Sequence, residues 1–96
     1  AAAIPERVPL YLTIDADGLD PTVMPAVMAP APGGLYFEQV APLLERLARR
    51  QPVVGMDIVE IAPRFDAANG ITCITAGRLV VTVIGASWAA RARPAA

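Results

Sequence analysis

The chain has 96 residues, which is enough for one small domain but too few for two separate cores. Its composition is apolar, with 55% hydrophobic and 18% charged residues, and its 8 basic residues, all arginines, nearly balance 9 acidic ones to give a net charge of -1. That balance excludes a broad cationic surface for nucleic acid, and the single Cys73 excludes an intramolecular disulfide.

The first predicted element is a strand over residues 10–14. Leu10, Leu12 and Ile14 alternate there with Tyr11 and Thr13, which is the pattern of a half-buried strand. Residues 21–34 then hold four prolines and two glycines, so neither a helix nor a central strand can continue through them. We expect a long and fairly rigid loop.

An amphipathic helix is expected after Gly34. Its apolar positions follow the helical spacing i, i+3, i+4, i+7: Val40, Leu43, Leu44 and Leu47. Because a proline is tolerated only near a helix start, we expect the regular part to begin around Pro42, after an irregular lead-in over 36–41. Three arginines close the helix, where they complement its dipole and solvate one face: Arg46, Arg49 and Arg50.

A second strand is expected over residues 53–61, an almost continuous apolar run interrupted by Asp57 and Glu60. The order strand, helix, strand is that of a βαβ unit, whose strands lie parallel and whose crossover is right-handed. The sequence therefore predicts an open α/β sheet.

Residues 71–86 are rich in β-branched side chains, so propensity alone leaves helix and strand open. The length of the segment favours a helix, and we expect a flexible tail over 87–96. The apolar run from Leu79 to Ala90 is shorter than the roughly 20 residues of a membrane span. Since no export signal precedes Pro5 either, we expect a soluble, cytoplasmic protein without a membrane partner.

Two carboxylates, Asp15 and Asp17, follow the first strand. Alternate side chains of an extended chain share a face, and ligands of open α/β sheets bind at the carboxyl ends of the strands. Two neighbouring carboxylates repel one another unless a divalent cation lies between them. Their hard oxygen atoms favour magnesium, calcium or manganese.

Two interpretations of this acidic motif fit poorly. A calcium loop that begins at Asp15 needs Gly at its sixth position and Glu at its twelfth, where Asp20 and Ala26 stand. The first motif of haloacid-dehalogenase-like phosphatases resembles residues 15–18, but Leu19 replaces its usual threonine. The chain also has no lysine for a phosphate.

A longer motif supports a third interpretation. It runs Thr13-Ile14-Asp15-Ala16-Asp17-Gly18-Leu19-Asp20-Pro21, followed by Met24-Pro25-Ala26 and Pro30-Ala31-Pro32-Gly33-Gly34-Leu35. It resembles the metal-binding signature of the ureohydrolases, the arginase and agmatinase family. Residues 57–63, Asp66 and the helix from Thr72 to Gly85 also resemble that family, so the similarity extends over roughly residues 8–86.

The resemblance implies a three-layer α/β/α sandwich with a parallel sheet, of which residues 1–96 would form a C-terminal portion with its core at about 8–86. It implies that Asp15 bridges two manganese ions, that Asp17 binds one of them, and that these ions activate the water that attacks a guanidinium carbon. Glu60 would bind the substrate, and Asp20 would steady the loop. We expect Asp57, three positions from Glu60 and on the opposite strand face, to be a structural hydrogen-bond partner.

The chain departs from the family in two respects. It has no histidine, so the family's Gly-Gly-Asp-His and Asp-Ala-His ligand segments are absent, and we expect the 96-residue chain to be inactive alone. Residues 26–29 also lack the alternating Gly and Thr of many relatives, which leaves arginine, agmatine, guanidinobutyrate and formimidoylglutamate open as substrates. The resemblance implies a trimer or hexamer. A haloacid-dehalogenase-like phosphatase fragment and a non-catalytic metal-binding or oligomerisation piece remain the alternatives.

Overall fold

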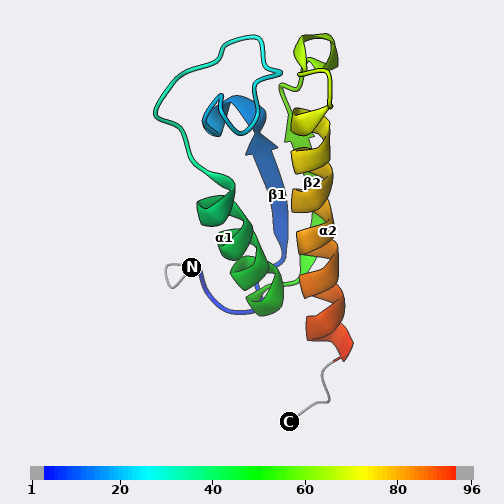
Figure 1. Cartoon of the computed structure of the whole chain (residues 1–96). Coiled ribbons are helices and arrows are strands. Elements are labelled where there is room, and N and C mark those ends of the chain that lie inside the picture. Colours follow the sequence, from blue (N-terminus) through cyan, green and yellow to red (C-terminus); the bar gives the residue numbers. More distant parts are fainter. Residues whose placement is uncertain (1–3, 93–96) are drawn as a thin grey trace.

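The computed structural model describes residues 4–92. Its elements, in chain order, are β1 (Leu10–Asp15), η1 (Ala16–Gly18), α1 (Phe37–Arg50), β2 (Val53–Val59), η2 (Pro63–Phe65) and α2 (Ile71–Ala92). The two strands form a parallel pair joined through α1, which is the predicted βαβ unit (Figure 1). The expected α/β class is confirmed, with a sheet of two strands in the described part of the chain.

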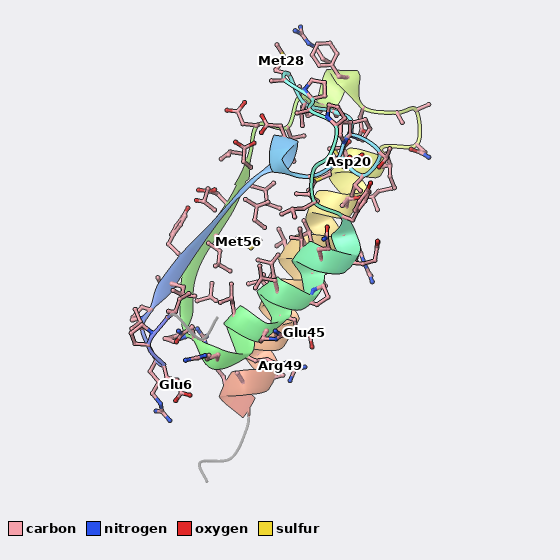
Figure 2. All side chains as sticks on the ribbon, turned by 90° about the vertical axis from the view of Figure 1, so that its left-hand side faces the viewer. Glu6, Asp20, Met28, Glu45, Arg49 and Met56 are labelled. Carbon is pink, nitrogen blue, oxygen red and sulfur yellow. The ribbon has the colours of Figure 1, made fainter. Side chains whose placement is uncertain are left out.

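The register of the two strands divides their side chains between two faces. Leu12 pairs with Met56 and Ile14 with Ile58, and these four side chains pack against the buried core on the helix side. Both helices lie on this one side of the sheet, and Met56 points toward them (Figure 2). The alternation predicted for β1 is thus confirmed.

Helix α1 begins at Phe37, five residues before Pro42, so the start predicted near Pro42 is wrong. The amide of Tyr36 donates to the Gln39 side chain at 2.9 Å, which satisfies a free donor at the helix start. Pro42 removes only the bond to the carbonyl of Glu38, and both residues are exposed, so water can solvate that group.

The apolar face of α1 is narrower than its sequence pattern predicts. Val40, Leu44 and Ala48 are buried, whereas Leu43 is 46% exposed. Leu43 lines an apolar groove beside β1 at an open edge of the sheet, together with Leu12 and Leu47. Further apolar surface therefore remains available for packing there.

The segment from Pro21 to Gly34 is a loop, as predicted, but it is well packed. Met24 and Ala26 are fully buried. The amide of Ala26 donates to the Thr72 hydroxyl at 3.0 Å, and its carbonyl accepts from the amide of Ala62 at 2.8 Å. The loop is therefore fastened to α2 and to the segment that follows β2.

Helix α2 confirms the helical interpretation of residues 71–86 but continues to Ala92. The flexible tail expected from residue 87 is therefore wrong as far as the helix extends, because Ala89, Ala90 and Ala92 are strong helix formers. Residues 93–96 of that expected tail lie outside the described residues.

The extended helix also changes the comparison with a membrane span. Ile71–Arg91 has 21 residues at a mean hydropathy of 1.5, so it is long and apolar enough to cross a membrane by length and composition. The run from Leu79 to Ala90, which from the sequence alone we compared with a membrane span, is only part of this helix. In this fold Leu79, Val83 and Ala86 are buried in the core that α2 shares with α1 and the sheet.

The second face of the sheet carries no helix among the described residues (Figure 2). Tyr11, on this face, is 60% exposed. Monomeric soluble proteins rarely leave a large apolar face uncovered. The described residues therefore form two layers of an incomplete sandwich.

Candidate active site

Asp15 ends β1, and Asp17 lies in the short 3-10 turn that follows. Asp15 Oδ1 accepts a hydrogen bond from the Asp17 amide at 3.1 Å, which starts this turn. Strand alternation, which we expected to bring the two carboxylates together, therefore does not extend to Asp17. The turn produces their proximity instead.

The carboxylates at this end of the sheet influence one another. The pKa of Asp17 is raised above its ordinary value by the hydrogen bond with the Asp15 carboxyl group, by partial desolvation, and by the negative charges of Asp15 and Glu60. A raised carboxyl pKa means that the ionised cluster is unfavourable without a cation. A divalent cation among these oxygens would relieve the repulsion.

Glu60 follows β2 directly, at the carboxyl end of that strand. Its φ is 68°, in the left-handed region that residues with a Cβ seldom adopt. Since β2 ends at Val59, the direction of the Glu60 side chain is set by this turn and not by strand alternation. Next to it, Ile61 bridges Val27 of the loop. The parallel strands thus bring Glu60 to the same end of the sheet as Asp15.

Asp20 fastens the two ends of the loop and is only 6% exposed. Its Oδ1 accepts from the hydroxyl and the amide of Thr22 at 2.7 and 3.0 Å, and its Oδ2 accepts from the Gly33 amide at 3.0 Å. The hydroxyl bond from Thr22 is the main cause that lowers the pKa of Asp20. Both carboxylate oxygens are therefore engaged within the loop, and Figure 2 shows Asp20 beside this loop.

Asp57 lies away from this cluster, on the open face of the sheet. Its Oδ2 accepts from the Tyr11 hydroxyl at 2.9 Å. That bond, with the nearby charge of Asp57, raises the pKa of Tyr11. The Tyr11 ring lies over Gly55, where an added Cβ would come within 2.6 Å of it. Asp57 thus has a structural partner within the sheet.

Two residues near the site have roles that the sequence did not indicate. Thr72 is fully buried and ties α2 to Ala26 of the loop through its hydroxyl. Asp66 accepts from the amides of Thr72 and Cys73 at the start of α2. Desolvation works to raise the pKa of Asp66, but these hydrogen bonds outweigh it and lower the pKa to about 2. An acid several residues before a helix start is the only sequence signal for this arrangement.

The acidic cluster fits part of a metal site. Asp15 and Asp17 offer hard carboxylate oxygens, whose mutual repulsion a divalent cation would relieve. Within residues 4–92, however, no group of three or more His, Cys, Asp or Glu side chains is placed to hold a metal ion. The chain therefore offers two ligands, and a dinuclear site needs further ligands from elsewhere.

Comparisons with known proteins identify the family. The chain is 44% identical over 89 residues to N(1)-aminopropylagmatine ureohydrolase of Thermus thermophilus, a match that covers 85% of this chain and 29% of that protein. The agmatine ureohydrolase of Thermoplasma volcanium has a similar structure, with a TM-score of 0.77 and 39% identity over 91% of this chain and 28% of that one. Proclavaminate amidino hydrolase of Streptomyces clavuligerus gives a TM-score of 0.79 at 33% identity, over 88% of this chain and 27% of that one.

The chain thus spans less than a third of the length of these relatives. The model of the family described as "Arginase family" matches residues 1–85, which include both strands and the acidic loop. With this match over most of the sequence, and the same fold in the solved relatives, the chain belongs to the arginase family.

Proposed function

We propose that this chain contributes two metal ligands and one substrate-binding carboxylate to a manganese-dependent ureohydrolase. The observation that supports the proposal best is the interaction of Asp15, Asp17 and Glu60 at one end of the sheet, in a chain of the arginase family. The complete enzyme would hydrolyse a guanidino compound to urea and an amine. The arginase-family match sets aside the phosphatase alternative.

Each residue has a defined role in this proposal. Asp15 would bridge two manganese ions, and Asp17 would bind one of them. Bound manganese supplies the Lewis acidity that polarises water and lowers its pKa. Glu60 would bind the planar guanidinium cation through paired, charge-assisted hydrogen bonds and orient its carbon. In the hydrolysis the oxygen of water forms a bond to that carbon, the bond to the alkyl-substituted nitrogen breaks, and the amine leaves with a proton.

The substrate remains to be chosen by experiment. Relatives named agmatinase and N(1)-aminopropylagmatine ureohydrolase make agmatine the first compound to assay, beside arginine, guanidinobutyrate and formimidoylglutamate. We also propose a cytoplasmic location and a trimeric or hexameric assembly for the complete protein.

The test uses a chain extended upstream by the two histidine-bearing segments of the family. Manganese-dependent urea release is expected from at least one guanidino compound. Asp15→Asn should weaken manganese retention by more than about tenfold, because an amide is a poor substitute for a bridging carboxylate. Glu45→Gln is the matched control, since it removes an exposed acid on α1 without touching the site. An extended chain that retains manganese but releases neither urea from the guanidino compounds nor formamide from formimidoylglutamate would refute the proposal.

A non-catalytic role in metal binding or oligomerisation is the second candidate. It is favoured by the lack of a three-ligand metal group within the described residues. Equilibrium dialysis of the 96-residue chain and of the extended chain against manganese separates the two. Retention by both chains without urea release supports this candidate, whereas urea release from the extended chain contradicts it.

A further inference from the structure

A second cavity lies at the opposite end of the sheet from the acidic cluster. It has a volume of about 290 Å³, is open to solvent on one side, and lies between the last turns of α1 and α2 and the segments that enter the two strands. Its wall contains four arginines: Arg7, Arg49, Arg50 and Arg91. No Asp or Glu of the described residues lines it. Figure 2 shows Arg49 at this end of the molecule, far from Asp20 and the loop.

The charge of this cavity is largely uncompensated. Among the described residues the only ion pair is the one between Arg49 and Glu45, at 3.1 Å on the surface of α1. The carboxyl ends of α1 and α2 each bring about half a negative charge, which offsets only part of the three guanidinium groups outside that ion pair. Dipole compensation, which we assigned to Arg49 and Arg50 from the sequence, therefore does not account for the whole cluster.

Three buried polar atoms with no hydrogen-bond partner belong to residues that line this same cavity: Arg50 Nε, Gln51 Oε1 and Ser87 Oγ. Gln51 as a whole is 3% exposed. Native proteins satisfy nearly all buried polar groups, because an unpaired one is destabilising. Only one other such side-chain atom occurs among the described residues, Asp57 Oδ1 at the sheet. The concentration at this cavity indicates a missing polar ligand.

The unpaired atoms belong to side chains that are already held in place. Arg50 Nη2 donates to the carbonyl of Ile4 at 2.9 Å, and Gln51 Nε2 donates to the carbonyl of Pro5 at 2.7 Å. Arg7, on the same lead-in segment, has a φ of 65°. Such strain in a residue with a Cβ is concentrated at functional sites. The cavity is therefore preorganised in its arginine and amide groups.

We infer that this cavity binds a small oxyanion that also carries one hydroxyl group, as hydrogen phosphate does. Arg50 Nε and Ser87 Oγ would donate to its oxygens, and Gln51 Oε1 would accept from its hydroxyl. Arg7 and Arg91 would balance its charge with bidentate geometry. The inference does not depend on the guanidine chemistry proposed for the other end of the sheet. Inorganic phosphate and the phosphate group of a larger metabolite present this same chemistry.

The arginine Nε–H signals in ¹⁵N NMR spectra report on the site directly. The 96-residue chain is titrated with inorganic phosphate against sodium chloride of equal ionic strength, and with a phosphate monoester to distinguish the two sources. A saturable shift of the Arg50 Nε–H signal is expected. Arg91→Gln should weaken phosphate binding by about tenfold, since it removes a charge-assisted contact. Ser87→Ala should weaken it less, and it keeps helix propensity.

Arg46→Gln is the matched control, because Arg46 is an arginine of α1 outside this cavity. Its variant should bind phosphate as the unaltered chain does. Equal weakening by Arg46→Gln and Arg91→Gln would reveal only general charge attraction and overturn the inference. A linear, unsaturated shift of Arg50 would do the same. Loss of phosphate binding in the chain extended upstream would show that protein atoms fill the cavity, which also contradicts a ligand site.

Discussion

The close approach of Gly34 to the start of the loop gives a sharp test of how the acidic segment is held. A Cβ added to Gly34 would lie 2.6 Å from the Asp20 amide nitrogen and 2.7 Å from the Leu19 carbonyl carbon. Ordinary contact begins at 3.4 Å. Both atoms are backbone atoms, so no side-chain rotation can relieve the clash. Gly34→Ala must therefore push the two ends of the loop apart.

That separation acts on two hydrogen bonds that close the loop. The Asp20 amide donates to the Leu35 carbonyl at 2.8 Å, and the Leu35 amide donates to the Gly18 carbonyl at 3.0 Å. Each backbone bond contributes about 1 kcal/mol net, and overpacking costs about 1–3 kcal/mol. We expect Gly34→Ala to lower the free energy of unfolding by about 3–5 kcal/mol.

Urea denaturation followed by circular dichroism measures this difference. Gly18→Ala is the matched control, because its added Cβ would meet no atom within 4 Å. Its unfolding free energy should change by less than about 0.5 kcal/mol. Equal urea midpoints for the two variants would show that the contact at Gly34 does not hold the loop.

Three further changes test the fold and the site. Met24→Ala should lower the free energy of unfolding, measured by urea denaturation, by about 2–5 kcal/mol. Met28→Ala, at a side chain that is 65% exposed, should leave the urea midpoint unchanged. Equal effects of the two changes would contradict the packing of Met24. The pKa of Asp66 is lowered to about 2 from 3.8, so its stabilising effect is complete above pH 3.8 and is lost as pH falls toward 2. Helix content of Asp66→Asn, followed by circular dichroism, should therefore fall less over that range than in the unaltered chain, and an identical acid profile would refute the assignment. Glu60→Gly should unfold at a higher urea concentration than Glu60→Gln. The reason is that glycine relieves about 1 kcal/mol of backbone strain at this left-handed position.

The strands and their parallel pairing could be predicted because apolar alternation and the βαβ order depend on short stretches of sequence. The start of α1 could not, since the contact of the Gln39 side chain with the Tyr36 amide is not a strong sequence signal. The predicted α2 ended too early because its last turns have no buried apolar face to mark them in the sequence. Alanines, which favour the helical conformation, continue the helix there. Asp15 and Asp17 could be chosen from the motif, yet the 3-10 turn that joins them appears only in three dimensions.

At Glu60, the residue type that would favour folding differs from the residue type that the proposed chemistry needs. A left-handed position just after a strand suits Gly or Asn, and a carboxylate there adds to the negative charge that already raises the pKa of Asp17. Both features disfavour the folded chain in the absence of ligands. Sequences usually agree with their fold at every level, and the conflicts that persist are concentrated at functional sites. A bound cation beside Asp17, or a guanidinium group against Glu60, would reverse the charge penalty, so ligand binding and folding should stabilise one another at this end of the sheet.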